Sequence, residues 1–289
     1  MSHNWQPAKL SRAVRTREII PEILSTFDAY GIHATWATVG ALFADTKEEI
    51  LSRAPQVESY ISRIGNDERD DPAHFASTLI RRIRETPFQE VGSHTFSHHV
   101  LGPSTESKVF EHEIHASVDI ARVHGVTVKS IVCPQNKTIS ALNRAALRRC
   151  GITNYRGADE LYGNNTPATR AKRFLDSYMR IQKYGTKRWD QVLERDGMVN
   201  VEGSIILRPF TPALRHLDSL KLRRITTYME HAAKSGEIFH LWWHPHNFAT
   251  YTKENFRLLR SILDTFTQLE HLYGMRSLTM AEVADEARL

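Results

Sequence analysis

The stretch "EVGSHTFSHHVLGP", residues 90–103, joins a predicted strand to a cluster of histidines. "EVGSHTF" is expected to form a short strand that runs into a loop, and the cluster contains His94, His98 and His99. His94 and His98 are four positions apart, so one helical turn or a curled loop places both imidazoles on the same side. Two such side chains can bind one divalent metal ion, whereas His99 is expected to point elsewhere.

Strands and helices alternate along the sequence around this stretch. Apolar residues at helical spacing cover residues 14–30, Gly31 follows as a helix end, and the run "HATWATVGALF" (33–43) predicts the next strand. Further strands are predicted in "TVKSIVCP" (127–134), "TNYRG" (153–157), "GSIILRPF" (203–210), "EIFHLWWHPHNF" (237–248) and "RSLTM" (276–280). Helices are predicted at 48–64, 72–84, 105–124, 140–150, 217–234 and 254–273. This alternation predicts parallel βα units in an α/β barrel.

The composition describes one ordinary globular domain over residues 1–289. The net charge of +5 is scattered, and no nucleic-acid-binding signature accompanies it. Cys133 and Cys150 form neither a disulfide framework nor a zinc ribbon, which favours a reducing compartment. No run approaches the roughly 18 apolar residues of a membrane span, and the polar start is unlike a signal peptide. We therefore expect a cytoplasmic protein.

Polar side chains follow three of the predicted strands. They lie in "GSHTFSHH" (92–99), in "VCPQNK" (132–137) and in "HLWWHPHNF" (240–248). In parallel barrels the loops after the strands carry the functional side chains, and imidazoles suit both metal binding and proton transfer. Simpler interpretations remain open, because an isolated His-x-x-x-His pair is a common chance match. His240 also lies in an apolar run, where a buried structural histidine is expected.

These motifs resemble those of the polysaccharide deacetylases, the NodB-homology family of carbohydrate esterases. "EVGSHTFSHH" resembles the family's His-[Ser/Thr]-x-x-His motif, and "YGIHATWATVG" (30–40) is similar to the helix-to-strand passage that precedes it. "IVCPQNK" (131–137) and "HLWWHPHNF" stand where the family carries its third motif and its catalytic histidine. The resemblance covers residues 15–285 and is closest to a branch that acts on surface-polysaccharide precursors.

The resemblance implies a metal-dependent hydrolase that removes acetyl groups from an N-acetylated sugar, on an incomplete (β/α)7 barrel. His94 and His98 would be metal ligands, with zinc the expected ion. His244 would protonate the departing sugar amine. Pro134 and Asn136 would shape the wall of the substrate groove, and His246 would bind substrate or replace His244.

The family's first motif, a strand ending in two aspartates, is not found. "STFDAYG" (25–31) looks similar, but only six residues separate Asp28 from Thr35, and a parallel crossover needs a dozen or more. We expect Phe27 to pack and Asp28 to face solvent within a helix. The third motif also lacks the arginine common in relatives. The available acids, none of them at a predicted strand end, are Asp45, Asp67, Asp70, Asp71 and Asp159.

Three functions follow as hypotheses. The first is a zinc-dependent carbohydrate deacetylase whose first strand lies upstream of Met1. The second is a non-catalytic carbohydrate-binding or regulatory protein on the same fold, and the third is another amide hydrolase. Two histidines alone hold zinc poorly, because zinc sites normally have at least three protein ligands. The sequence as written therefore predicts little or no deacetylase activity.

Overall fold

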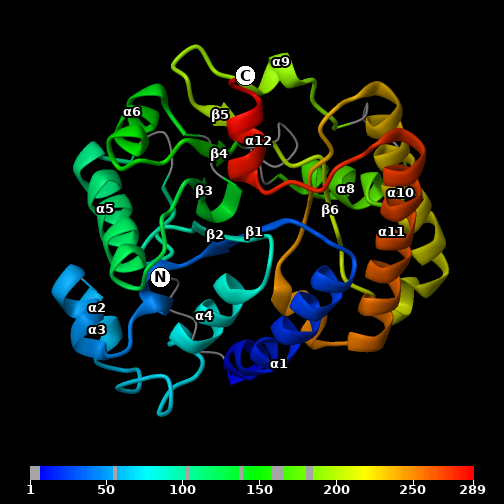
Figure 1. Cartoon of the computed structure of the whole chain (residues 1–289). Helices are drawn as coiled ribbons and strands as arrows, with labels where there is room; N and C mark the ends of the chain where they lie inside the picture. Colours follow the sequence, from blue (N-terminus) through cyan, green and yellow to red (C-terminus); the bar gives the residue numbers. More distant parts are fainter. Residues whose placement is uncertain (1–6, 55–56, 102–104, 137–138, 158–165, 180–184) are drawn as a thin grey trace.

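The computed structural model describes residues 7–54, 57–101, 105–136, 139–157, 166–179 and 185–289. Within these ranges the strands form two parallel sheets (Figure 1). The larger sheet has the order β1-β2-β3-β4-β5. Its strands are β1 (Ala34–Thr38), β2 (Gln89–Ser93), β3 (Ser130–Val132), β4 (Asn154–Arg156) and β5 (Val199–Asn200). The smaller sheet pairs β6 (Ile205–Ile206) with β7 (Leu241–Trp242).

The predicted α/β class with parallel strands is confirmed, but hydrogen bonds do not close a barrel. Every named strand pair is parallel. Among the described strands, β1 pairs only with β2, and β7 pairs only with β6. The order of strands therefore leaves an opening between β1 and β7. "RSLTM" is predicted to be a strand, but residues 276–279 have no regular secondary structure and Met280 begins the last helix, α12.

Helices surround the two sheets (Figure 1). The described α-helices are α1 (Pro7–Ala29), α2 (Lys47–Arg53), α3 (Glu58–Ile61), α4 (Ser77–Glu85), α5 (Ser107–Val123), α6 (Ala141–Arg149), α8 (Pro167–Asp176), α9 (Trp189–Val192), α10 (Asp218–Ser235), α11 (Thr252–Tyr273) and α12 (Met280–Glu286). Short 3-10 helices are η1 (Gly40–Phe43), η3 (Pro134–Asn136), η4 (Pro212–Leu217) and η5 (Pro245–Ala249). Two of these, η3 and η5, carry candidate site residues.

Helix α1 runs without a break through Pro21, and Gly31 follows it with a φ of 62°. Phe27 is 3% exposed and Asp28 faces solvent, and residues 25–29 of "STFDAYG" belong to this helix, as expected. The Phe27 ring lies 6.3 Å from the ring of Trp36 and 6.0 Å from the ring of Trp243, measured between centroids. Phe27 therefore packs against both sides of the opening between β1 and β7.

The buried side chains form two large cores. One packs α4, α5 and α6 against β1–β4, and the other packs α1, α10 and α11 around the β6–β7 pair. Trp36 is half-buried and contacts both cores. Because its large aromatic side chain packs against both cores, Trp36 joins the two halves of the molecule at β1.

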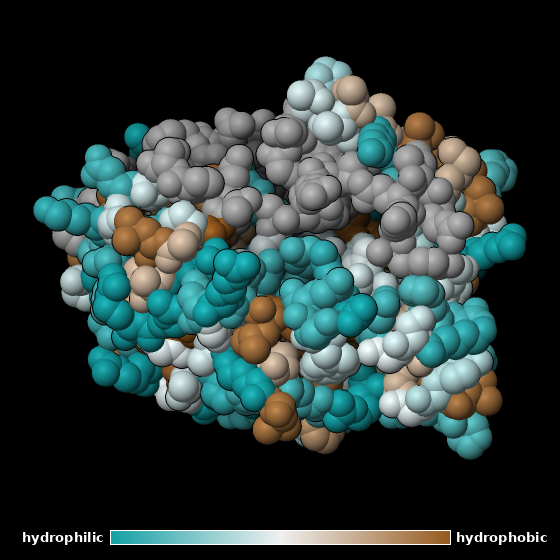
Figure 2. All heavy atoms as spheres, turned by 90° about the horizontal axis from the view of Figure 1, so that it is seen from above, coloured by the Kyte–Doolittle hydropathy of each residue, from teal (hydrophilic) through white to brown (hydrophobic). Residues whose placement is uncertain are grey.

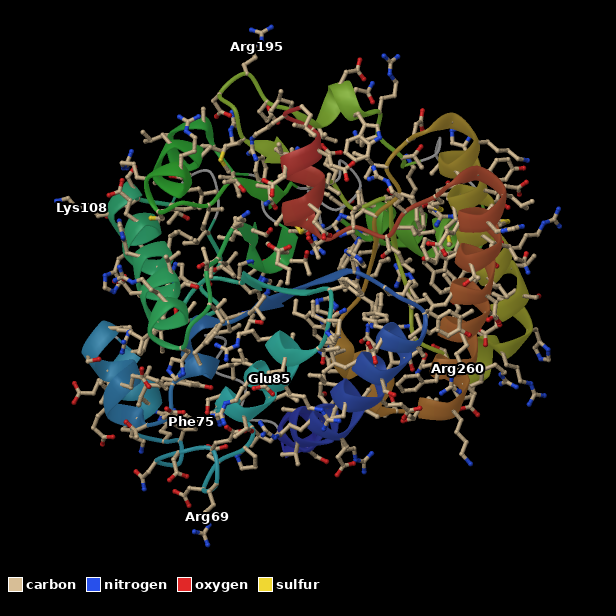
Figure 3. The ribbon with its side chains drawn as sticks, viewed as in Figure 1. Arg69, Phe75, Glu85, Lys108, Arg195 and Arg260 are labelled. Atoms are coloured by element: carbon tan, nitrogen blue, oxygen red, sulfur yellow. The ribbon has the colours of Figure 1, made fainter. Side chains whose placement is uncertain are left out.

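The surface charges are dispersed, in agreement with the scattered charge of the sequence. Figure 3 shows Arg69, Lys108 and Arg195 at well-separated places on the periphery, pointing away from the core. The face in Figure 2 is mostly hydrophilic, with apolar side chains in small separate groups.

Candidate functional site

The loop after β2 brings His94 and His98 together. Their ring centroids lie 4.9 Å apart. The Nδ1 of His94 lies 2.6 Å from the carbonyl oxygen of Val132 on β3. Because a carbonyl oxygen only accepts, Nδ1 carries the proton and Nε2 keeps its lone pair. Metal-binding histidines are commonly oriented by such a bond.

A buried carboxylate holds this loop in place. Glu113 on α5 is 3% exposed, and its two oxygens accept hydrogen bonds from the backbone N–H of Ser97, at 2.9 Å, and from the Ser97 hydroxyl, at 2.7 Å. Thr95 and His98 have φ angles of 64° and 58°, which are rare for residues other than glycine. Such backbone persists only where surrounding contacts impose it, and it is concentrated at functional sites. Glu113 supplies two of those contacts.

The loop after β3 has the same kind of backbone. Gln135 and Asn136 in η3 have φ angles of 59° and 54°. The Asn136 side-chain oxygen accepts hydrogen bonds from Nε and Nη2 of Arg156, at 3.2 and 2.9 Å. Pro134 is buried and, unlike the histidines, does not line the cavity described below.

Arg156 is a site residue that the sequence analysis missed. It ends β4, and its guanidinium lies 4.2 Å from the ring centroid of Trp242 on β7. Arg156 thus lies on the strand next to β3, the strand that leads into "IVCPQNK". The signal was present, because "TNYRG" was predicted as a strand and Arg156 is at its C-terminal end.

The loop after β7 brings a second pair of imidazoles. The ring centroids of His244 and His246 are 5.1 Å apart, at the start of η5. Helix α1 packs against η5. His240, expected to be a structural histidine, is half-buried, and its Nδ1 lies 3.1 Å from the carbonyl oxygen of Val201.

One cavity of about 570 Å³ connects these groups. His94, His98, Arg156, His244 and His246 all line it. The two predicted histidine motifs therefore meet at the same end of the fold. Asn136 does not line the cavity itself, but it accepts a hydrogen bond from Arg156, which does. His99 is exposed and does not line the cavity. Among the described lining residues, every ionisable side chain is histidine or arginine, and no aspartate or glutamate is present.

Burial and mutual repulsion lower the pKa values of these histidines. Burial, together with the charges of His98, Arg156 and His244, lowers the pKa of His94 to about 3. Burial, His246, Arg156 and His98 lower the pKa of His244 to about 4. Burial also lowers the pKa values of His98 and His246. The imidazoles are therefore neutral near pH 7, the form that binds a metal ion.

The described residues do not fit a complete metal centre at His94 and His98. Within the described ranges, one set of potential metal ligands lies close enough together to share an ion. It consists of Asp45, Glu49 and His124, and none of these residues lines the cavity. Both carboxylate oxygens of Glu49 have partners within that set. Oε2 accepts a hydrogen bond from the backbone N–H of Asp45, and Oε1 lies 3.3 Å from His124 Nε2. The two cavity imidazoles would need at least one more ligand.

The remaining acids considered from the sequence do not supply that ligand. Asp67, Asp70 and Asp71 cap turns between α3 and α4, where they accept hydrogen bonds from nearby backbone N–H groups, and they are not part of the cavity lining. Asp159 lies outside the described residues. No described helix is both long enough and apolar enough to pass through a bilayer.

Comparisons with known proteins indicate one family. The sequence model described as polysaccharide deacetylase matches residues 12–155. No curated protein gives a significant match. A Mycobacterium smegmatis structure named as a polysaccharide deacetylase has a TM-score of 0.61 at 11% identity and covers 96% of this chain and 80% of its own.

Two further structures illustrate the range of similarity. A GH57-type branching enzyme from Pyrococcus horikoshii has a TM-score of 0.51 at 10% identity, covering 98% of this chain and 67% of its own. A chitin deacetylase from Colletotrichum lindemuthianum has a TM-score of 0.47 at 18% identity, and the match covers 92% of this chain and 81% of the chitin deacetylase chain. At these identities structural similarity shows the fold alone. With the match over residues 12–155, which includes the His94–His98 motif, the chain belongs to the polysaccharide deacetylase family.

Proposed function

We propose that this protein has the framework of a metal-dependent hydrolase that removes acetyl groups from an N-acetylated sugar of a surface polysaccharide or its precursor. We further propose that the described residues are not sufficient for catalysis. The observation that carries the second proposal is the absence of any carboxylate among the described residues that line the cavity. Hydrolysis of this kind needs a third metal ligand and a general base.

The residues that are present suit recognition of an acetylated sugar. Arg156 offers guanidinium N–H donors to a carbonyl or hydroxyl oxygen, and its orientation is fixed by Asn136 and by the face of Trp242. His244 and His246, neutral near pH 7, can each accept a hydrogen bond from a sugar hydroxyl or amide N–H. His244 would need a higher pKa before it could act as a general acid. A carboxylate placed beside it would produce that change.

The proposal is tested by two measurements on the purified chain. With N-acetylated oligosaccharides and added zinc we expect no acetate release above the background of a His94→Ala variant. Elemental analysis after dialysis should give well below one zinc per chain. Release of acetate that a chelator stops and that His94→Ala abolishes, while His99→Ala retains it, would contradict the proposal. His99 is a matched control because it is exposed and outside the cavity.

A non-catalytic carbohydrate-binding protein is the second candidate, and the same cavity supports it. The two candidates differ in binding. A carbohydrate-binding protein should bind an N-acetylated oligosaccharide without zinc, and Arg156→Ala should weaken binding by about tenfold or more, since a hydrogen bond to a charged group contributes about 1.5–3 kcal/mol. No detectable binding in calorimetry without zinc would exclude this candidate.

A further inference from the structure

A partly exposed aromatic pair lies beside the histidine loop that follows β7. Phe210 follows β6 and Tyr251 follows η5, and their ring centroids are 5.5 Å apart with the ring planes at 63°. Because β6 and β7 are parallel, the segments that follow them leave from the same edge of the sheet. The pair therefore lies at the end of the fold where His244 and His246 are found.

The backbone of Tyr251 has a conformation that its residue type does not favour. Its φ and ψ angles are 51° and 45°, in the left-handed region, where glycine and asparagine are common and bulky residues are rare. Burial of the ring does not explain this conformation, because Tyr251 remains 51% exposed. Strained residues of this kind persist where surrounding contacts impose them, and they are concentrated at ligand-binding and catalytic sites.

One buried amide side chain imposes this conformation. Asn255, which is 1% exposed, accepts a hydrogen bond from the backbone N–H of Phe210 at 2.7 Å. Its Nδ2 group donates to the carbonyl oxygens of Asn247, Thr250 and Tyr251, at 3.3, 2.8 and 3.1 Å. The same side chain thus fixes the backbone of both aromatic residues, and it does so before any ligand binds.

The same amide places the aromatic pair next to the cavity. Asn247 directly follows His246, and a single nitrogen of Asn255 bonds to the carbonyl oxygens of both Asn247 and Tyr251. His246 lines the cavity, whereas Phe210 and Tyr251 do not. The two rings therefore lie outside the rim of the cavity, where they can contact the part of a ligand that extends beyond it.

The chemistry of the pair suits a sugar ring. The C–H groups on one side of a pyranose form an apolar face that packs on an aromatic ring, and the tyrosine hydroxyl adds a group that can hydrogen-bond to a sugar hydroxyl. Neither phenylalanine nor tyrosine carries a charge near pH 7, which favours a neutral sugar unit over an anionic group. A tilted, edge-on arrangement of two rings is favourable in itself, so the pair is formed in advance of binding.

We infer that Phe210 and Tyr251 form a second sugar subsite, which binds the pyranose ring next to the one held in the cavity. Asn255 is the positioning residue of this subsite, because its bonds hold both aromatic residues in place. The inference rests on the proposed function, since it takes the acetylated sugar to enter beside the histidines. It specifies the ligand further, as a chain of at least two linked sugars rather than a single acetylated sugar.

The test compares two ligands in calorimetry on the full chain with zinc added. N-acetylglucosamine can occupy one subsite at a time, whereas tetra-N-acetylchitotetraose is long enough to reach both. We expect Tyr251→Ala to weaken binding of the tetrasaccharide about three- to tenfold, the range that corresponds to one aromatic contact, and to leave binding of the monosaccharide unchanged. Tyr251→Phe retains the ring and should therefore retain most of the affinity for the tetrasaccharide.

Tyr273→Ala is the matched control, because Tyr273 is 46% exposed and lies at the other end of α11. It should leave the affinity for both ligands unchanged. The inference is overturned if the tetrasaccharide does not bind, if Tyr251→Ala binds it as tightly as the wild type, or if Tyr251→Ala weakens both ligands equally. The acetate and zinc measurements do not depend on Tyr251, so a failure of this inference is distinguishable from a failure of the proposed function.

A second measurement uses the wild-type chain and does not depend on the folding of a variant. NMR spectra of the complex with tetra-N-acetylchitotetraose should show nuclear Overhauser contacts between the Tyr251 ring and C–H protons of the sugar. The Tyr273 ring should show none. Bound tetrasaccharide without contacts to the Tyr251 ring would overturn the inference even if Tyr251→Ala does not fold.

Discussion

The hydrogen bonds between Ser97 and Glu113 can be tested by replacing Glu113 with Gln, a side chain of almost the same shape. Both residues are 3% exposed, so water does not compete for these bonds. Gln keeps one acceptor oxygen for the Ser97 N–H, but its NH2 group then faces the Ser97 hydroxyl, which can accept from that group and loses the acceptor for its own hydrogen. A bond to a charged group contributes about 1.5–3 kcal/mol, and an unsatisfied buried donor costs about 1–3 kcal/mol. We expect the free energy of unfolding to fall by about 2–4 kcal/mol.

The assay is urea unfolding, since total stabilities of about 5–15 kcal/mol make such a change easy to resolve. Glu111→Gln is the matched control, because Glu111 lies on the same helix and forms an exposed ion pair with Arg149. That exposed ion pair should contribute only about 0–1 kcal/mol to the free energy of unfolding. Ser97→Ala completes a double-mutant cycle, with an expected coupling of about 0.5–3 kcal/mol between Ser97 and Glu113.

Two results would refute this reasoning. One is a Glu113→Gln protein as stable as the Glu111→Gln protein. The other is strict additivity of Ser97→Ala and Glu113→Gln, which would mean that the two side chains do not interact in solution. Because Ser97 lies between His94 and His98, loss of the contact should also loosen the histidine loop, seen as faster amide exchange over residues 94–99.

The remaining predictions concern packing, thiol chemistry and pH. Gly40→Ala should destabilise the fold by about 1–3 kcal/mol in urea unfolding, because an added Cβ would lie 2.9–3.1 Å from Phe96 and from the backbone of α5; wild-type stability would contradict this. Burial raises the pKa of Cys133 to about 12, so a thiol reagent at pH 8 should label it only after unfolding, and rapid labelling of the native protein would show that the site is open. Burial, with the charge of Arg156, lowers the pKa of His240 to about 4, below its unfolded value of about 6.5. The unfolded chain then binds more protons, so the free energy of unfolding should fall as the pH drops from about 6.5 toward 4 and His240→Asn should reduce that fall; a pH-independent stability would refute the assignment.

Features that depend on local sequence were predicted well. The Thr-x-x-Glu pattern of Thr279 and Glu282 is the sequence signature of a capping box, and each side chain does accept a hydrogen bond from the backbone N–H of the other residue. The strand in "HATWATVGALF" and the helix end at Gly31 were also located correctly. Each of these depends on residues only a few positions apart.

Other features were not predicted, one for a local reason and the rest because they depend on distant contacts. The helix expected over residues 48–64 is divided into α2 and α3. Ala54 precedes a proline in the sequence and leaves the helical region, with φ −145° and ψ 69°. The contribution of Arg156 required knowing that β4 lies beside β3, and that of Glu113 required knowing that α5 packs under the histidine loop.

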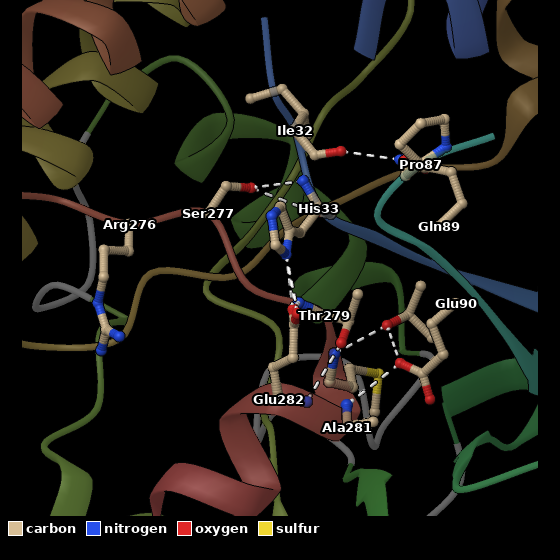
Figure 4. Close-up of polar contacts among 12 residues, drawn as sticks. Ile32, His33, Pro87, Gln89, Glu90, Arg276, Ser277, Thr279, Ala281 and Glu282 are labelled. Atoms are coloured by element: carbon tan, nitrogen blue, oxygen red, sulfur yellow. Dashed lines mark hydrogen bonds and ion pairs between the residues drawn. The ribbon is translucent and has the colours of Figure 1, made fainter. Parts of the chain in front are cut away.

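The anchoring of α12 has a consequence for how the chain folds. The first N–H groups of this helix bond to Thr35 on β1 and to Glu90 on β2, about 245 and 191 positions earlier in the sequence (Figure 4). Since ordering a contact between such remote segments is slow, docking of the C-terminal helix should be a late step in refolding, after β1 and β2 have paired. Kinetic refolding followed by pulse-labelled exchange should therefore show protection in β2 before it appears in α12.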